Sequence, residues 1–285
     1  MVAFASNSLL CRLALKHTSI DAASFTFIRI FSGAVALWFI MRMRNASKFS
    51  NSSLVTGHLS LSQSGNWPSA LALFAYAAAF SFAYISLSAA TGALLLFGAV
   101  QATMIIWGLR KGETLHLRQL FGLALALAGL IALLFPGLSA PPLGGAILML
   151  VAGIAWGIYS LRGKGTSDAI SATAGNFLRS VPLAAALSIA QLAWMHLDRA
   201  GVAYAVLSGA IASGVGYVIW YTALPGLKAA SAATVQLSVP VLAAAGGILL
   251  LGEPLTLRFF LASIAVLGGI ALVVISPRPT QAPKP

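Results

Sequence analysis

Acidic side chains are scarce in this chain: five occur among 285 residues, against 17 lysines and arginines. All five fall at the ends of long apolar stretches, as Asp21, Glu113, Asp168, Asp198 and Glu253. Carboxylates inside a membrane are the usual proton relays and cation sites. Their absence from these stretches argues against a multidrug-type mechanism, in which one buried glutamate binds protons and cations in turn. Uniport, or coupling through other groups, fits better.

Catalytic and metal-binding patterns are missing as well. The single cysteine, Cys11, excludes an intrachain disulfide and a thiolate metal cluster. His17, His58, His116 and His196 lie between the apolar stretches and lack the spacing of metal ligands. The chain has no Walker loop and no convergent Ser-His-Asp or Cys-His set. We therefore expect no enzyme activity, no cofactor and no direct use of ATP.

Apolar residues, by contrast, are abundant. They make up 59% of the chain, only 8% of residues are charged, and the mean hydropathy is +0.94. A helix needs about 20 apolar residues to cross a bilayer. The composition therefore predicts an all-α integral membrane protein with ten transmembrane helices. These cover residues 2–15, 22–41, 68–87, 91–109, 119–135, 143–161, 170–194, 201–222, 229–251 and 257–275.

The basic residues indicate an orientation in the membrane. A net charge of +12 would suggest nucleic-acid binding in a soluble protein, but here the charges lie singly or in pairs at stretch ends. If the chain crosses the bilayer at each stretch in turn, one side receives only Arg12, Lys16, Arg199 and Arg258. Most of the other lysines and arginines fall on the opposite side. The positive-inside rule makes the richer side cytoplasmic. We expect both termini in the cytoplasm, a cytoplasmic tail at 276–285, a flexible cytoplasmic loop at 45–66, a lipid partner and no nucleic acid.

One short phrase occurs twice. Residues 112–118 read Gly-Glu-Thr-Leu-His-Leu-Arg, and residues 252–258 read Gly-Glu-Pro-Leu-Thr-Leu-Arg. A Phe-x-Arg phrase likewise ends at Arg29 and again at Arg179. Five apolar stretches separate the two Gly-Glu phrases, so the second copy should be inverted. The sequence therefore predicts two five-helix repeats, residues 1–135 and 143–275. Inverted repeats recur in secondary transporters, which bind substrate near the membrane midplane where the repeats meet; some channels share them.

Together these phrases and the ten stretches resemble the drug/metabolite transporter superfamily, with two repeats of the EamA type. The aromatic segment 74–84 is similar to the YddG-like branch of bacterial aromatic amino acid exporters. The resemblance implies export across the bacterial inner membrane by alternating access, without a cofactor. It also implies a central cavity among the first, third, fourth, sixth, eighth and ninth helices.

Several aromatic residues are candidates to line that cavity. Tyr76, Phe80 and Tyr84 recur every four residues and share one helix face. Bundle packing or a lipid-facing belt would produce the same stripe, although Phe80 lies too deep for a belt. Aromatic walls suit flat apolar or cationic ligands. The sixth and eighth stretches add comparable faces with Trp156, Tyr159, Trp220 and Tyr221.

Polar residues within the stretches are the second group of candidates. Asn7, Gln101 and Gln236 are proposed to orient polar groups of the substrate, and Gln101 is favoured because it lies mid-stretch. Hydrogen bonding between helices is the alternative for each, and for Asn176 as well. Pro240 would free a backbone carbonyl that could receive an ammonium group.

Four charged residues are assigned to gating or structure. Arg29 and Arg179 lie inside apolar stretches, where they contact either backbone carbonyls and loop acids or a substrate carboxylate. Glu113 and Glu253 precede the last helix of each repeat, where an anion favours the positive end of the helix dipole. We interpret both as helix caps, with a gating role as the alternative.

These features predict an inner-membrane exporter of amino acids, with aromatic amino acids favoured, present as a monomer or weak homodimer. A carrier for another metabolite or drug would share them. A pore-forming channel is the second alternative.

Overall fold

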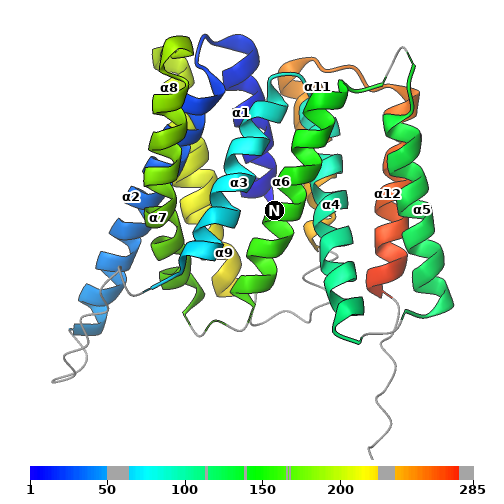
Figure 1. The fold of residues 1–285 in the computed structure, drawn as a ribbon, viewed down its shortest axis with the longest axis horizontal. Coiled ribbons are helices and arrows are strands. Elements are labelled where there is room, and N and C mark those ends of the chain that lie inside the picture. The colour runs from blue at the N-terminus through cyan, green and yellow to red at the C-terminus, as the bar shows by residue number, and fades with distance from the viewer. Residues whose placement is uncertain are drawn as a thin grey trace, which may run out of the picture.

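The computed structural model describes residues 1–49, 64–112, 115–137, 140–164, 166, 168–223 and 235–275. Glu113 lies outside them. The described chain is a bundle of helices (Figure 1). Its helices are α1 (Val2–His17), α2 (Ala22–Phe49), α3 (Trp67–Tyr84), α4 (Ala89–Arg110), α5 (Leu117–Leu134), α6 (Leu143–Gly163), α7 (Ala169–Ala190), α8 (Arg199–Val206), η2 (Leu207–Val215), α9 (Gly216–Ala223), α11 (Ser238–Leu251) and α12 (Leu257–Ile275), with a short 3₁₀ turn, η1 (Leu192–Trp194), after α7.

The architecture is that of an integral membrane protein. Among the described residues, seven helices are long and apolar enough to cross a bilayer, and α8, η2 and α9 together form one of them. Each of the ten predicted stretches contains helix in its described part, although α1 has only 16 residues and α11 only 14, and residues 229–234 of the ninth stretch lie outside the described residues. Ten crossings, and the side on which the termini lie, stay predictions.

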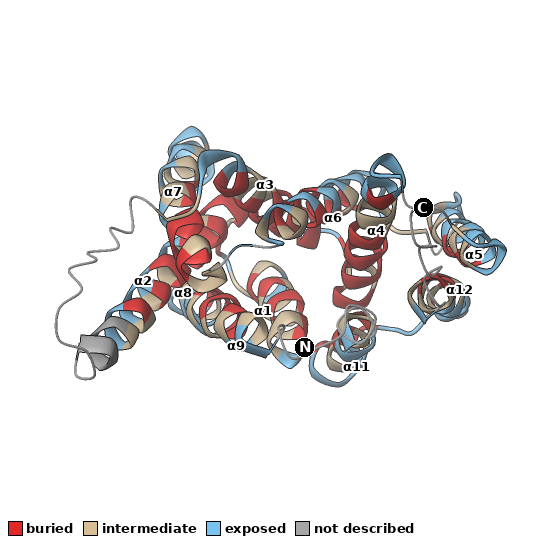
Figure 2. Cartoon of the chain, turned by 90° about the horizontal axis from the view of Figure 1, so that it is seen from below, coloured by how far each residue is buried: buried red, intermediate tan, exposed pale blue. Residues whose placement is uncertain are grey.

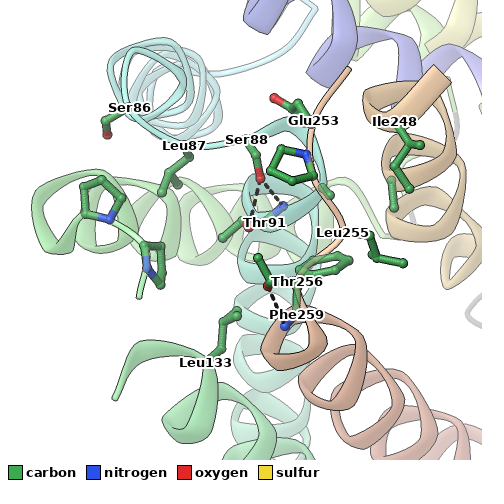
Figure 3. Close-up of a pocket in the computed structure, with 15 residues that line it drawn as sticks. Ser86, Leu87, Ser88, Thr91, Leu133, Ile248, Glu253, Leu255, Thr256 and Phe259 are labelled. Atoms are coloured by element: carbon green, nitrogen blue, oxygen red, sulfur yellow. Dashed lines mark hydrogen bonds between the residues drawn. The ribbon is translucent and has the colours of Figure 1, made fainter. Parts of the chain in front are cut away.

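Side-chain caps explain where several helices begin. Ser88 accepts a hydrogen bond from the Thr91 amide at 3.2 Å at the start of α4, and Thr256 accepts one from the Phe259 amide at 3.1 Å at the start of α12 (Figure 3). Asn66 caps α3 by accepting from the Ser69 amide at 2.9 Å. Each supplies an acceptor for an amide that has no partner within its helix.

The predicted loop at 45–66 begins too early, whereas its described residues 64–66 are not helical. Helix α2 continues to Phe49, so five of these residues are helical. At the other end, Asn66 is held by its capping bond and by its backbone amide, which donates to the Asn176 side chain at 2.9 Å. A serine- and asparagine-rich composition indicates polarity, but those same side chains are the ones that cap and anchor helices.

The most extensive contacts between helices are preserved when each helix is exchanged for its counterpart in the other half. The counterpart pairs α2 with α7 and α5 with α12 pack together directly. The contact of α3 with α6 corresponds to that of α8 and η2 with α1, and α4 with α6 corresponds to α11 with α1. Such an exchange is what two structurally similar halves require. The repeat boundaries themselves stay a prediction.

Helices α5 and α12 lie next to each other at one lateral edge of the bundle (Figure 2). A Cβ added to Gly122 would lie 2.6 Å from the Gly269 carbonyl, and one added to Gly269 would lie 2.4 Å from the Gly122 carbonyl. One added to Gly129 would lie 3.1 Å from the Ala262 carbonyl. Contacts that advance along α5 thus retreat along α12, so the two helices are antiparallel. They follow the two Gly-Glu phrases, and an inverted repeat requires this orientation of them.

An ion pair joins α2 to the start of α7. Arg44 donates from Nη1 to Asp168 Oδ1 at 3.1 Å and from Nη2 to the Ser171 hydroxyl at 2.9 Å. Partial burial of the Asp168 carboxyl favours its neutral form, but the hydrogen bonds from Arg44 and Ser171 outweigh this and lower its pKa to about 2.

This pKa predicts how stability depends on pH. The folded pKa of Asp168 lies below the value of about 3.9 in an unfolded chain, so its ionised form stabilises the fold above that pH. The stabilisation should disappear as the pH falls from about 4 through about 2. Asp168→Asn should therefore unfold at a lower temperature than the parent protein near pH 6, with the gap closing in acid. Thermal unfolding in detergent at stepped pH measures this, and a gap that stays constant would contradict it.

Candidate functional site

An aromatic cluster lies inside the bundle, where α1, α3, α6, α7 and α9 meet. Neighbouring ring centroids lie 4.7–6.5 Å apart. The cluster comprises Phe4, Tyr76, Phe80, Tyr84, Trp156, Tyr159, Phe177, Tyr217, Trp220 and Tyr221. All seven aromatic residues that the sequence predicts as candidates belong to it. The structure brings them together, while their contact with substrate stays a prediction.

Trp156 on α6 is the centre of this cluster. Its ring stacks on Tyr159 and on Tyr217, each at 5.3 Å with an interplanar angle of 28°. It also lies 4.9 Å from Tyr76 on α3 and 6.5 Å from Phe4 on α1. Because Trp156 is only partly buried, its ring also leaves some surface uncovered.

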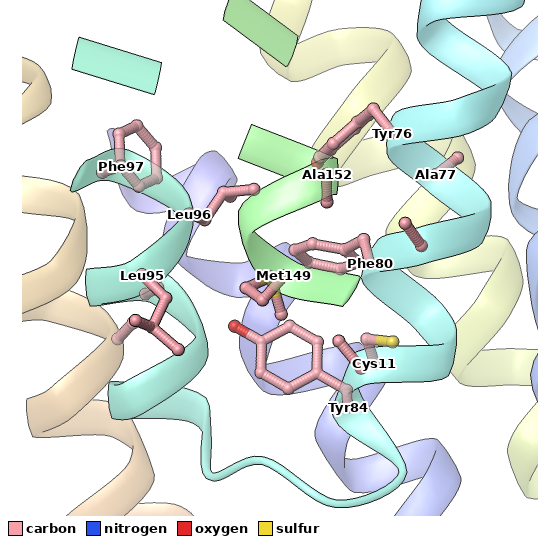
Figure 4. Packing of buried hydrophobic residues seen from close by; sticks show 14 of the residues in the cluster. Cys11, Tyr76, Ala77, Phe80, Tyr84, Leu95, Leu96, Phe97, Met149 and Ala152 are labelled. Carbon is pink, nitrogen blue, oxygen red and sulfur yellow. The ribbon is translucent and has the colours of Figure 1, made fainter. Parts of the chain in front are cut away.

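Tyr76, Phe80 and Tyr84 point from α3 toward α6 and α4, as Figure 4 shows. Their spacing therefore produces the predicted shared face. Tyr84 sits at the end of the row, where its hydroxyl donates to the Ala89 carbonyl at 3.3 Å. It lines the end of the bundle rather than its middle.

Sequence reasoning missed Phe4, Phe177 and Tyr217. Phe177 belongs to the repeated Phe-x-Arg phrase, and Tyr217 precedes Tyr221 by one helical turn, so the pattern contained a signal for both. Phe4 carries no such signal. It joins the cluster because α1 packs against η2, which lies next to α9 in the chain.

Arg29 on α2 lies against the α3 side of the cluster and is 2% exposed. Its Nη2 donates to the Tyr76 hydroxyl at 3.0 Å, and its guanidinium carbon lies 4.8 Å from the Phe80 ring centroid. Its Nη1 is buried without a hydrogen-bond partner. The counterpart Arg179 is only half-buried and donates to the Gly175 carbonyl at 3.0 Å. The two arginines thus have different surroundings despite their matching phrases.

Asn7 connects α1 to a π-helical segment. Its side-chain oxygen accepts hydrogen bonds from Ser208 at 2.7 Å and from Ser213 at 3.4 Å, both on η2. Single π-helical turns interrupt the regular ladder and frequently occur at functional sites. The contact matches the interhelical alternative for Asn7. A substrate role for this residue stays a prediction.

Gln101 and Gln236 lie apart from the aromatic cluster's contacts. Gln101 lines a cavity of about 20 Å³ that is otherwise apolar and is enclosed by α4, α5 and α12. That volume suits little more than one water molecule. Gln236 is half-buried just before α11. Pro240 falls in the first turn of α11, where its missing amide leaves the Gln236 carbonyl without a helical partner.

Glu253 caps α4 rather than α12. The Ala89 amide donates to its carboxylate oxygens at 3.1 and 2.9 Å, and Arg12 Nε donates to it at 3.3 Å. Gly252 turns the chain with a φ of 61°, and Glu253 is 7% exposed. We name this ion pair and its Ala89 contact the latch. The prediction that Glu253 caps α12 is therefore wrong: Thr256 caps that helix, and Pro254 lies before it.

The latch lies where the end of α3, the start of α4 and the segment before α12 meet α1. Arg12 Nη1 also donates to the carbonyls of Tyr84 and Ile85 at 2.9 and 3.0 Å, which ties α1 to the end of α3. A cavity of about 190 Å³ adjoins Glu253 between the α3–α4 turn, α11 and α12 (Figure 3). This cavity is the larger of the two described, but the aromatic cluster is the better candidate site because it adjoins a buried, incompletely bonded cation.

Comparisons with known proteins agree with this architecture. The EamA-like transporter family matches residues 143–275. An uncharacterized protein of Pseudomonas aeruginosa is 56% identical over 96% of this chain and 91% of its own length. A probable amino-acid metabolite efflux pump of Escherichia coli is 28% identical over 72% of this chain and 75% of its own.

Two further comparisons are more distant. An uncharacterized transporter of Archaeoglobus fulgidus is 26% identical over 68% of this chain and 70% of its own. One crystal structure shares the fold with a TM-score of 0.62 at 17% identity, covering 95% of both chains. The relatives with functional names are transporters and not enzymes. Residues 143–275 are therefore a domain of the EamA-like transporter family, and the names of the more distant relatives support placing the chain in the drug/metabolite transporter superfamily.

Proposed function

We propose that this transporter exports amino acids, aromatic ones above all, across the bacterial inner membrane, as the aromatic amino acid exporter branch does. The aromatic cluster centred on Trp156 carries the proposal, because its stacked rings offer flat apolar surface inside the bundle. The E. coli relative, named a probable amino-acid metabolite efflux pump, supports the substrate class.

Alternating access is the mechanism that fits this arrangement. The latch would close one end of the bundle, and the cluster extends away from it along α3, from Tyr84 beside Arg12 to Tyr76 about two turns further on. Exchangeable contacts between the two halves support a second state in which the roles of the halves are reversed. We place both termini in the cytoplasm from the charge distribution, and the chain acts as a monomer or weak homodimer in the bilayer.

Counterflow in liposomes tests the function. Vesicles loaded with unlabelled phenylalanine should accumulate labelled phenylalanine, and the rate should saturate. Trp156→Ala removes the central stacking surface. It should raise the tryptophan concentration that gives half the maximal rate by about tenfold. Trp107→Ala, which changes an exposed ring on α4, is the matched control.

The alternatives give different results in the same vesicles. A carrier for another metabolite or drug would exchange neither phenylalanine nor tryptophan but would respond to a wider substrate panel. A pore-forming channel would pass solute without saturation and without counterflow. Either result would overturn amino acid export by this chain.

A further inference from the structure

Among the described residues, the buried charge of Arg29 has no counter-ion. In the described part of the chain, ion pairs join Arg12 to Glu253 and Arg44 to Asp168, and neither includes Arg29. Its position seven residues after the start of α2 places it about 10 Å along that helix. A buried cation without a paired anion is strongly unfavourable. An anion supplied from outside the protein would remove that penalty.

The hydrogen bonds around Arg29 are also incomplete. Nη2 donates to the Tyr76 hydroxyl at 3.0 Å, while Nη1 is buried and finds no acceptor among the residues that the structure describes. The Tyr76 oxygen accepts this bond, which leaves its own proton to donate, and no described residue accepts it. One buried N–H group and one O–H group therefore remain open on adjacent side chains. A carboxylate, with two oxygens that accept hydrogen bonds, matches this pair.

Aromatic rings surround this pair of donors. The Arg29 guanidinium carbon lies 5.2 Å from the Tyr76 ring centroid and 4.8 Å from that of Phe80. The Tyr76 ring in turn lies 4.9 Å from Trp156. A ligand with its anionic group at Arg29 would thus have its apolar part within reach of the centre of the aromatic cluster.

We propose that Arg29 and Tyr76 bind the carboxylate of the transported molecule, with its apolar side chain against Trp156. This inference rests on the proposed function and specifies the charged group that the site recognises. It makes the site selective for carboxylates and not for amines or cationic drugs. The counterpart Arg179 does not share this role, since backbone carbonyls occupy its Nη1.

Ligand selectivity of the unmodified protein is the first test. Phenylalanine, 3-phenylpropionate, phenylalaninamide and phenethylamine share a ring but differ in the carboxylate and the amine. Both carboxylates should inhibit counterflow and raise the unfolding temperature of the detergent-solubilised protein. The amide and the amine should bind about tenfold more weakly or worse, because they cannot accept a charge-assisted pair of bonds.

Substitutions provide the second test. Arg29→Gln should abolish the preference for carboxylate over amide, and Arg29→Lys should retain part of it, because the lysine keeps the charge but not the guanidinium geometry. Tyr76→Phe should weaken carboxylate binding while sparing the amide. Arg42→Gln is the matched control: Arg42 also lies on α2 over an aromatic ring, Trp38, but it is exposed.

Each outcome is decisive. Equal binding of phenylalanine and its amide by the unmodified protein would overturn the proposal while leaving amino acid export intact. A carboxylate preference that survives Arg29→Gln would also overturn it. If Arg29→Gln does not accumulate in the membrane, the unmodified protein and Arg29→Lys decide. Failure of every ligand to bind or exchange would instead refute the proposed function.

Discussion

Glu253→Gln should make Cys11 react with maleimides about tenfold faster or more than in the parent protein. Cys11 is fully buried and precedes Arg12. The change removes the negative charge that holds Arg12, whose other bonds go to the carbonyls of Tyr84 and Ile85. Removing one partner of a buried ion pair destabilises the folded structure by about 3–5 kcal/mol. Glutamine is neutral but still accepts hydrogen bonds, so Glu253→Gln should lose only part of this stabilisation. A loss of about 1.4 kcal/mol is enough to change an opening equilibrium tenfold.

The single cysteine makes this measurement direct, because the mass shift on labelling reports one site. Arg12→Ala should accelerate labelling in the same way. Asp198→Asn is the matched control, since Asp198 caps α8 by accepting from the Gly201 amide and takes no part in the latch. Labelling rates unchanged in both latch variants would show that the latch does not keep this end closed. Thermal unfolding of each variant separates opening of the latch from global unfolding.

Gly269→Leu should destabilise the bundle, whereas the same change at the preceding residue should not. A Cβ at Gly269 would meet backbone atoms of α5, the Gly122 carbonyl at 2.4 Å and the Ala126 amide at 2.7 Å. Backbone cannot rotate away as a side chain can, so α5 and α12 must separate. A Cβ at Gly268 would meet nothing within 4 Å. Overpacking of this kind costs about 1–3 kcal/mol or more.

Thermal unfolding in detergent measures the difference. Gly269→Leu should lower the unfolding temperature by about 5 °C or more, while Gly268→Leu should stay close to the parent value. Both variants carry the same added side chain on the same helix, so differences in hydrophobicity cancel. Equal unfolding temperatures would mean that α5 and α12 do not depend on close backbone approach at this point.

The helices could be predicted from the sequence because each one is a continuous run of mainly apolar residues. The predicted stretch 257–275 coincides with α12, and 143–161 falls two residues short of the end of α6. The grouping of Tyr76, Phe80 and Tyr84 was equally local, since helical spacing alone sets a shared face. Local spacing could not predict which helix packs against that row, because this depends on tertiary contacts. Trp156 meets Tyr76 and Tyr217 only because α6 packs between elements that lie far away in the chain.

Charged residues were harder to interpret, because their partners come from distant segments. Glu253 precedes α12 in sequence but bonds to Ala89, 164 positions earlier. Arg29 and Arg179 end matching phrases yet have different partners, a tyrosine hydroxyl for one and backbone carbonyls for the other. A repeat in sequence therefore predicts a matching position in the fold. It does not predict matching chemistry, since each half supplies different neighbours.

The antiparallel contact between α5 and α12 has a consequence for how the two halves recognise each other. Gly122 contacts Gly269, and Gly129 contacts Ala262. At the repeat's offset of 140 positions, Gly122 corresponds to Ala262 and Gly129 corresponds to Gly269, so the two contacts are equivalent to each other. Each helix thus presents a patch that fits the corresponding patch of the other, which is the property of an isologous interface between two identical subunits. One covalent chain contains what a two-fold symmetric dimer would contain. The two patches must therefore change together, since a larger residue on one helix is accommodated only by a smaller one on the other.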